Sequence, residues 1–197
     1  MSARLVLASA SESRRRMLKA AGITFDVVAP KADEAALKQS LAAETPEKLA
    51  TALAENKALS ISRSQAGALV LGADQLLVCE GRIYAKARDR EEARQILTEL
   101  RGHKHELVTA AALAKGSSVI WRHVETASLW MRDFSDAFLD AYLAQEADAV
   151  LDLVGCYRIE GRGAQLFSRV EGDSLTIQGL PLFAVMEALR AQGAMTP

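Results

Sequence analysis

The chain has little of several residue types that mark specialised proteins. Its 197 residues include two cysteines, four prolines and 5% aromatic residues. The two cysteines, Cys79 and Cys156, match no zinc-ligand spacing, and without an export signal they indicate a reducing compartment. A formal net charge of −1 offers nucleic acid no basic excess. No run approaches the roughly 20 apolar residues of a membrane span. We therefore expect a cytoplasmic protein that binds neither nucleic acid nor membrane.

Common nucleotide-binding and hydrolase signatures are also absent. The sequence contains no GxxxxGK[ST], no GxGxxG and no GxSxG, which argues against P-loop NTPases, dinucleotide dehydrogenases and α/β-hydrolases. Half of the residues are hydrophobic and a quarter are charged, a composition typical of globular proteins. The length suits a single domain over residues 1–197.

Strand-like and helix-like segments alternate along the chain. Residues 31–44 are polar and predicted to be irregular, and Glu80-Gly81 is predicted to be a hairpin turn. The order mixes βα units with an antiparallel hairpin, so we expect an α/β or α+β fold with a mixed sheet. Strands are expected at 5–8, 25–29, 68–72, 76–79, 106–114, 119–131, 156–159 and 165–170, and helices at 13–21, 46–63, 89–100, 135–145 and from 181 to Gly193.

The first eighteen residues have the pattern of a phosphate-binding loop. An apolar strand ends in Ser9-Ala10-Ser11, and Arg14 and Arg15 follow as a helix begins. Small residues let a ligand approach, free N–H groups point outward at a helix N-terminus, and guanidinium groups bind phosphate with two donors. Three consecutive arginines on a solvated helix face are the alternative. The position after the serines favours phosphate.

A carboxylate follows the next buried strand. Asp74 comes directly after Val70-Leu71-Gly72-Ala73, and ligands of open α/β sheets gather at such strand ends. Gly72 would let a ligand or a second backbone come close. An Asp that caps a turn is an equally good interpretation of this segment alone. Lys57 and Lys86, taken alone, are more typical of solvated lysines.

Two histidines, His103 and His105, suggest a metal site at first sight. No cysteine, aspartate or third histidine shares their spacing, so zinc is not favoured. His105 and Thr109 are four residues apart and should share one face of a strand.

Taken in order, the motifs resemble those of the Maf family of nucleoside triphosphate pyrophosphatases. The likeness spans almost the whole chain. The matching segments are Leu7 to Leu18, Asp33-Glu34, Glu55 to Ala58, Gly72 to Gln75, Ala85-Lys86, Arg101 to Thr109, Phe134 to Tyr142, Ile159 to Gly161, Gln165 to Phe167, Val170 to Asp173 and Gly179 to Leu182.

The resemblance implies a mixed α/β fold with two lobes around a deep cleft, similar to inosine triphosphate pyrophosphatases. It implies a homodimer that hydrolyses a nucleoside triphosphate to the monophosphate and pyrophosphate, with a divalent cation, Mg²⁺ or Mn²⁺. Asp74 falls on the catalytic carboxylate of the family, and Glu34 and Asp74 on the metal-binding positions. The phosphate-binding positions fall on Ser9, Arg14, Arg15, Lys57 and Lys86.

The resemblance also bears on the base. Gln75 and Glu160 match the subgroup that acts on 7-methyl-GTP. A carboxylate suits guanine, which offers two adjacent donors, N1–H and N2–H₂. Ser13 stands where that subgroup has tryptophan, and Glu12 replaces the usual proline. Two alternatives stay open, a pyrophosphatase acting on dTTP, UTP or CTP, and a nucleotide-binding regulator of septum formation with little or no turnover.

Overall fold

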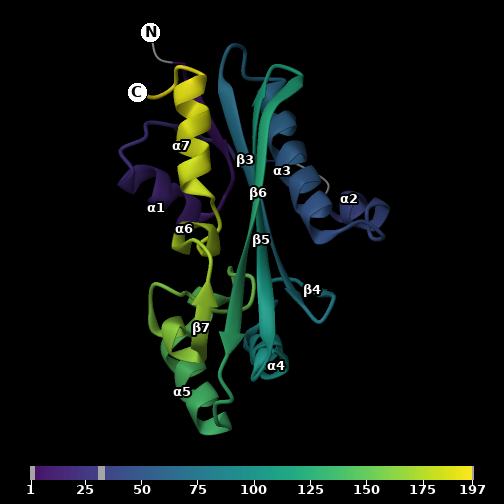
Figure 1. Ribbon diagram of the computed structural model, residues 1–197, viewed down its shortest axis with the longest axis vertical. Helices are drawn as coiled ribbons and strands as arrows, with labels where there is room; N and C mark the ends of the chain where they lie inside the picture. Colours follow the sequence, from purple (N-terminus) through teal and green to yellow (C-terminus); the bar gives the residue numbers. More distant parts are fainter. Residues whose placement is uncertain (1–2, 31–33, 197) are drawn as a thin grey trace. The chain divides into compact units, whose positions relative to one another are not determined.

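The computed structural model describes residues 3–30 and 34–196, which form a mixed α/β fold around a seven-stranded sheet. The strand order is β2-β1-β3-β5-β6-β7, with β4 paired to β3. In chain order the elements are β1 (Leu5–Ala8), α1 (Glu12–Ala20), β2 (Asp26–Val27), α2 (Glu34–Ser40), α3 (Pro46–Ser62), β3 (Leu69–Cys79), β4 (Arg82–Tyr84), α4 (Arg90–Leu100), β5 (Lys104–Lys115), β6 (Ser118–Met131), α5 (Asp136–Glu146), η1 (Ala147–Val150), η2 (Arg162–Leu166), β7 (Phe167–Glu171), α6 (Ser174–Ile177) and α7 (Leu182–Ala191) (Figure 1).

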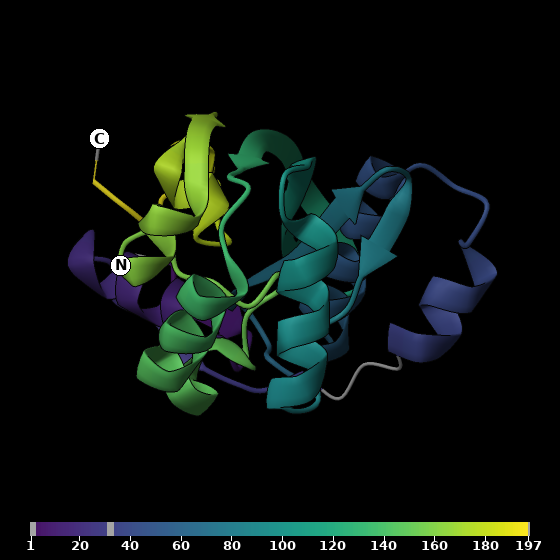
Figure 2. The same cartoon turned by 90° about the horizontal axis from the view of Figure 1, so that it is seen from below.

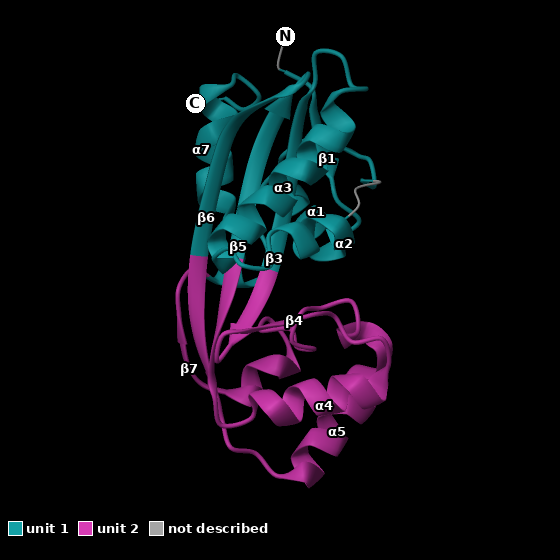
Figure 3. Ribbon diagram, turned by 90° about the vertical axis from the view of Figure 1, so that its right-hand side faces the viewer, with its two compact units in different colours: residues 1–75, 109–125, 174–197 teal, residues 76–108, 126–173 magenta. Residues whose placement is uncertain are grey.

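The chain divides into two compact units (Figure 3). Unit 1 comprises residues 1–75, 109–125 and 174–197, and unit 2 comprises residues 76–108 and 126–173. Strands β3, β5 and β6 contribute residues to both units, so each unit contains part of the sheet. The expected mixed α/β class is confirmed. The single domain over 1–197 stays a prediction.

In unit 1 the strands carry two different apolar faces. Strand β1 is parallel to β2 and to β3, with Leu5 opposite Leu69 and Ala8 opposite Gly72. Leu5 and Leu7 belong to the cluster that includes side chains of α1 and α7, while Val6 and Ala8 pack with side chains of α3. This is the alternation that a strand buried on both faces requires. Figures 1 and 2 accordingly show α3 on one side of the strands and α1 and α7 on the other.

Side-chain caps define where most of the predicted helices begin. The side chains of Ser11, Thr45, Asp89 and Ser135 each accept a hydrogen bond from the backbone N–H three residues later. Pro46 occupies the first turn of α3, where its missing N–H costs no hydrogen bond. The predicted starts of α3, α4 and α5 are confirmed.

Two secondary-structure predictions are wrong. The prediction that residues 31–44 are irregular fails at α2, because Glu34–Ser40 is rich in helix-forming residues although none of them is buried. Residues 31–33 lie outside the described part of the chain. The strand predicted at 156–159 is also wrong, since Gly155 and Cys156 have φ of 81° and 60° and cannot continue an extended strand.

Unit 2 contains the predicted hairpin. Strands β3 and β4 pair antiparallel with Cys79 opposite Arg82, and Glu80 and Gly81 have φ of 50° and 79°, as a tight two-residue turn requires. Strand β7 pairs antiparallel with β6. Among the described residues, no helix has the length and apolar character needed to cross a membrane.

Candidate active site

The loop between β1 and α1 encloses a buried arginine. The Oγ of Ser9 accepts hydrogen bonds from the backbone N–H of Ser11 at 3.1 Å and from Nη1 of Arg14 at 3.3 Å. Arg14 is 8% exposed, and its Nε donates to the carbonyl of Gly179 at 2.8 Å. The predicted loop is therefore present. The guanidinium of Arg14 has two neutral partners, Ser9 from this loop and the carbonyl of Gly179.

The guanidinium of Arg14 also interacts electrostatically with two carboxylates. Burial lowers its pKa below the usual value, while Asp74 and Glu34 act in the opposite direction. An arginine in a protein stays protonated under such opposing effects. A permanent buried positive charge therefore interacts electrostatically with two of the predicted acidic residues.

A close approach of α3 to β3 brings Lys57 to Asp74. A Cβ atom added to Gly72 would lie 2.3 Å from the carbonyl oxygen of Ala54 and 2.6 Å from the backbone nitrogen of Ala58. Only glycine permits this packing. The next residue on the same face of β3 is Asp74, and its carboxylate forms an ion pair with Lys57. Gly72 thus admits a second backbone, one of the two alternatives expected from the sequence.

Lys57 joins two of the predicted acidic residues. Its Nζ contacts Oδ1 of Asp74 and lies 3.1 Å from Oε1 of Glu34. The side chains of Lys57 and Asp74 are 11% and 10% exposed, against 38% for Glu34. Two carboxylates therefore converge on a single cationic position at the edge of a buried site.

Strand alternation places Gln75 on the other face of β3. Its Nε2 donates to Oγ1 of Thr109 at 2.8 Å and lies 3.0 Å from the carbonyl oxygen of Thr176. The hydroxyl of Thr176 contacts the carboxylate of Glu125. This network ties α6 to β3, β5 and β6, and α6 precedes the Gly179 carbonyl that binds Arg14. Sequence patterns did not suggest it, because its members are far apart along the chain.

The other predicted residues of α1, Ser13 and Arg15, have partners other than Asp74 and Glu34. The hydroxyl of Ser13 donates to the carbonyl of Gln178 at 2.8 Å. Arg15 forms an ion pair with Glu12 and lines a cavity of about 430 Å³ beside β2. Arg14 therefore interacts electrostatically with the carboxylates of Asp74 and Glu34, whereas the ion-pair partner of Arg15 is Glu12.

Lys86 and Glu160 belong to unit 2. Lys86 forms an isolated antiparallel bridge with Val154, so the backbone of Lys86 is fixed against the segment that precedes Glu160. Glu160 is exposed. The roles of these two residues, like those of the other predicted site residues, stay predictions.

A metal site is not evident from protein side chains alone. Within residues 3–30 and 34–196 no group of three or more His, Cys, Asp or Glu side chains could hold a metal ion.

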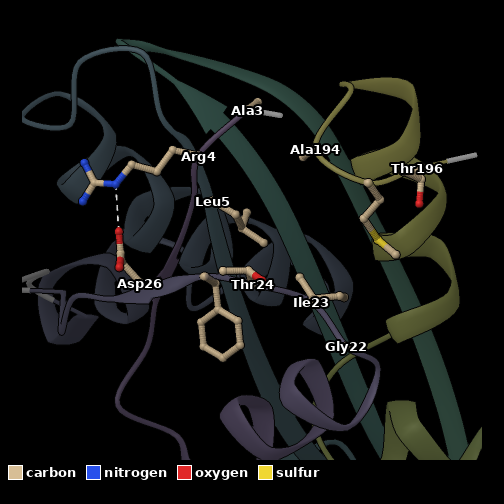
Figure 4. A pocket seen from close by; sticks show the side chains of 11 residues that line it. Ala3, Arg4, Leu5, Gly22, Ile23, Thr24, Asp26, Ala194 and Thr196 are labelled. Atoms are coloured by element: carbon tan, nitrogen blue, oxygen red, sulfur yellow. Dashed lines mark hydrogen bonds and ion pairs between the residues drawn. The ribbon is translucent and has the colours of Figure 1, made fainter. Parts of the chain in front are cut away.

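A further cavity of about 450 Å³ lies between the start of β1 and the C-terminal segment (Figure 4), with Arg4 and Asp26 paired at its wall. None of its lining residues is a predicted site residue.

Known proteins resemble this chain over nearly its whole length. The family of Maf-like proteins matches residues 4–192. A nucleoside triphosphate pyrophosphatase of Granulibacter bethesdensis is 51% identical over 195 residues, covering 98% of this chain and 99% of that protein. A 7-methyl-GTP pyrophosphatase of Rhizobium meliloti is 45% identical over 193 residues, covering 97% of each. A solved nucleoside-triphosphatase (dITP/XTP pyrophosphatase) of Mycobacterium abscessus covers 98% of both chains at 14% identity, with a TM-score of 0.39. The chain belongs to the Maf family.

Proposed function

We propose that the protein hydrolyses a nucleoside triphosphate to the nucleoside monophosphate and pyrophosphate, and so removes modified nucleotides from the pool. The observation that carries the proposal is the convergence of Asp74, Glu34, Lys57 and Arg14 in unit 1, in a chain that matches named pyrophosphatases over nearly its whole length. Phosphoryl transfer depends mainly on positioning and on electrostatic stabilisation, which such a cluster supplies.

The reaction assigns different tasks to these side chains. Water attacks the α-phosphorus, the bond from that phosphorus to the bridging oxygen breaks, and pyrophosphate leaves. Asp74 orients the water and accepts its proton, or holds the metal beside it. Arg14 and Lys57 bind phosphate oxygens and stabilise the charge that develops on them. Lys86 and Arg15 are proposed as further phosphate ligands, and Ser9 as a ligand through its hydroxyl.

Two carboxylates that share one cation fit a Mg²⁺ or Mn²⁺ ion. Asp74 and Glu34 both reach the Nζ of Lys57, and Mg²⁺ is usually held by one or two carboxylates together with substrate phosphates and water. When bound, the ion would neutralise phosphate charge and polarise the phosphoryl oxygens.

The proposed substrate is 7-methyl-GTP or another modified nucleotide with a guanine-like base. A relative with 45% identity is named 7-methyl-GTP pyrophosphatase, and Glu160 has the acceptor pair that guanine's two donors need. Gln75 and Ser13 are proposed to act on the base indirectly. Their side chains bond to the segment from Thr176 to Gln178, which leads into the Arg14 site.

The setting of the reaction is part of the proposal. We propose that the protein is a cytoplasmic homodimer. Its ligand is the nucleoside triphosphate substrate, and it binds neither nucleic acid nor a membrane. A net charge of −1 supports the absence of nucleic acid binding. Light scattering of the purified protein tests the dimer.

Pyrophosphate release tests the activity. The purified protein is incubated with Mg²⁺ or Mn²⁺ and each of 7-methyl-GTP, GTP, dTTP, UTP and CTP, with the Asp74→Asn variant in parallel. Release from 7-methyl-GTP that the substitution abolishes, with nucleotide binding retained, supports the proposal. Preferred release from pyrimidine nucleotides would support the pyrophosphatase activity but refute the assignment of a guanine-like base. Nucleotide binding without any pyrophosphate release would favour the alternative function, a nucleotide-binding regulator of septum formation.

A further inference from the structure

A buried histidine–tyrosine pair lies in unit 2. His105 on β5 is 1% exposed and Tyr157 is 5% exposed, and Nε2 of His105 lies 2.7 Å from the phenol oxygen of Tyr157. The ring of Phe167 packs against both, with centroids 5.8 Å from His105 and 4.8 Å from Tyr157. Burial lowers the pKa of His105 to about 4 and raises the pKa of Tyr157. Both side chains are therefore neutral at pH 7, joined by one hydrogen bond in apolar surroundings.

The segment that contains Tyr157 is held at further points. At its start, Val154 forms the backbone bridge with Lys86. The carbonyl of Cys156 accepts a hydrogen bond from the phenol of Tyr142 at 3.1 Å. Two residues before Glu160, Arg158 forms an ion pair with Glu146 at 2.9 Å. We name residues 154–160 the recognition segment, because Glu160 is its last residue.

The backbone of the recognition segment has a conformation that needs such support. Cys156 has a φ of 60°, an unusual value for a residue with a side chain. A Cβ atom on Gly155 would lie 2.5 Å from Leu77 and 2.7 Å from the ring of Tyr157. A Cβ atom on Gly163 would lie 2.4 Å from the carbonyl oxygen of Arg158. Sparsely populated backbone conformations persist where the surroundings fix them, and they concentrate at ligand-binding sites.

Stability alone does not explain a polar pair at this place. Nδ1 of His105 is buried and has no hydrogen-bond partner among the described residues, so the imidazole leaves one polar atom unsatisfied. Apolar side chains of similar shape would fill the space at a lower free-energy cost. A directional hydrogen bond differs from apolar packing in that it fixes one orientation of Tyr157, and with it the backbone on either side.

We infer that His105 and Tyr157 are positioning residues for nucleotide recognition, because their hydrogen bond fixes the recognition segment between Lys86 and Glu160. The inference rests on the proposed function, in which Lys86 binds phosphate and Glu160 binds the base. Neither His105 nor Tyr157 needs to touch the nucleotide. They set the position from which Glu160 distinguishes one base from another, so their loss should change selectivity more than turnover.

The test is Tyr157→Phe, which removes one oxygen and keeps the ring against Phe167. We expect the ratio of kcat/KM between the best and the worst nucleotide of the panel to fall about tenfold, the effect of one hydrogen bond. KM for the best nucleotide should rise, and kcat for the worst should stay near the wild-type value. Tyr84→Phe is the matched control, since it removes the hydroxyl of another buried tyrosine of unit 2 that is not bonded to His105. It should leave the ratio unchanged.

Substitutions of the histidine separate orientation from packing. His105→Gln retains a polar atom that can reach the phenol, and it should keep most of the selectivity. His105→Leu should lose it to the same extent as Tyr157→Phe. A lower melting temperature with an unchanged selectivity ratio in both Tyr157→Phe and His105→Leu would overturn the inference and leave only a structural role.

Amide hydrogen exchange keeps the inference testable if the proposed function fails. The wild-type protein alone decides the function, by releasing pyrophosphate or not. Faster exchange confined to residues 154–160 in Tyr157→Phe, and absent in Tyr84→Phe, supports the fixed segment. Exchange at the wild-type rate in that segment overturns it, whatever the wild-type protein hydrolyses.

Discussion

Replacing Gly72 by alanine tests whether the contact between α3 and β3 builds the site. The added Cβ would lie 2.3 Å and 2.6 Å from backbone atoms of Ala54 and Ala58, while an ordinary contact begins at 3.4 Å. Neither atom belongs to a flexible side chain, so α3 has to retreat by roughly 1 Å. Lys57 lies on the same stretch of α3, and its contact with Asp74 should lengthen with that movement.

The expected effects differ for stability and activity. Overpacking of this kind costs about 1–3 kcal/mol of unfolding free energy, which corresponds to a melting temperature lower by roughly 2–12 °C for a chain of this size. A displacement of 1 Å in a catalytic group lowers turnover by about 10²-fold. Pyrophosphate release should therefore fall far more than the folded fraction at 25 °C.

Thermal unfolding and pyrophosphate release on the same preparation check both effects. Gly161→Ala serves as the control for stability, because its added Cβ would meet nothing closer than 3.8 Å. A Gly72→Ala protein with wild-type turnover would refute the reasoning that the close packing of α3 places Lys57. A protein that loses turnover only in proportion to its unfolded fraction would refute it as well.

Two further predictions concern charges in the two units. Lys57→Gln should bind Mn²⁺ at least about tenfold more tightly in the absence of nucleotide, because it frees two carboxylates from a competing cation. Calorimetry measures the Mn²⁺ affinity, with the exposed Lys48→Gln as the control. An affinity equal to that of the wild-type protein would contradict the prediction. His105 has a pKa lowered by burial to about 4, so the unfolded chain binds the extra proton between about pH 6.5 and pH 4. The free energy of unfolding should therefore fall by about 2–3 kcal/mol as pH decreases through that window; urea unfolding at pH 7 and pH 4.5 measures it, and a fall of the same size in His105→Gln would show that another group is responsible.

Features that depend on neighbouring residues could be predicted from the sequence. The apolar run from Leu5 to Ala8 identified β1, and Thr45-Pro46 identified the start of α3, because strand burial and capping act within a few residues. The same logic failed at α2. That helix buries no residue, so it has no apolar periodicity, and only its helix-forming composition indicated it.

Contacts between distant segments could not be predicted in this way. Lys57 and Asp74 are 17 positions apart in the chain, and their contact depends on how closely α3 packs on Gly72. His105 and Tyr157 are 52 residues apart, and no local pattern relates them. The strand wrongly predicted at 156–159 has the same origin, since Cys156 has a φ of 60°, which its residue type does not favour, and its carbonyl is bonded to the phenol of the distant Tyr142.

The charges of the unit 1 cluster bear on the order of binding. Arg14 and Lys57 carry two positive charges, and Asp74 and Glu34 carry two negative charges, so the cluster is balanced without a ligand. A triphosphate brings about four further negative charges by the usual charge per phosphate. Because buried charges need partners, this cluster by itself cannot accept the triphosphate without additional cations. The nucleotide should therefore bind together with its divalent ion, and Lys57 should exchange its carboxylate partners for phosphate oxygens as the ion takes its place.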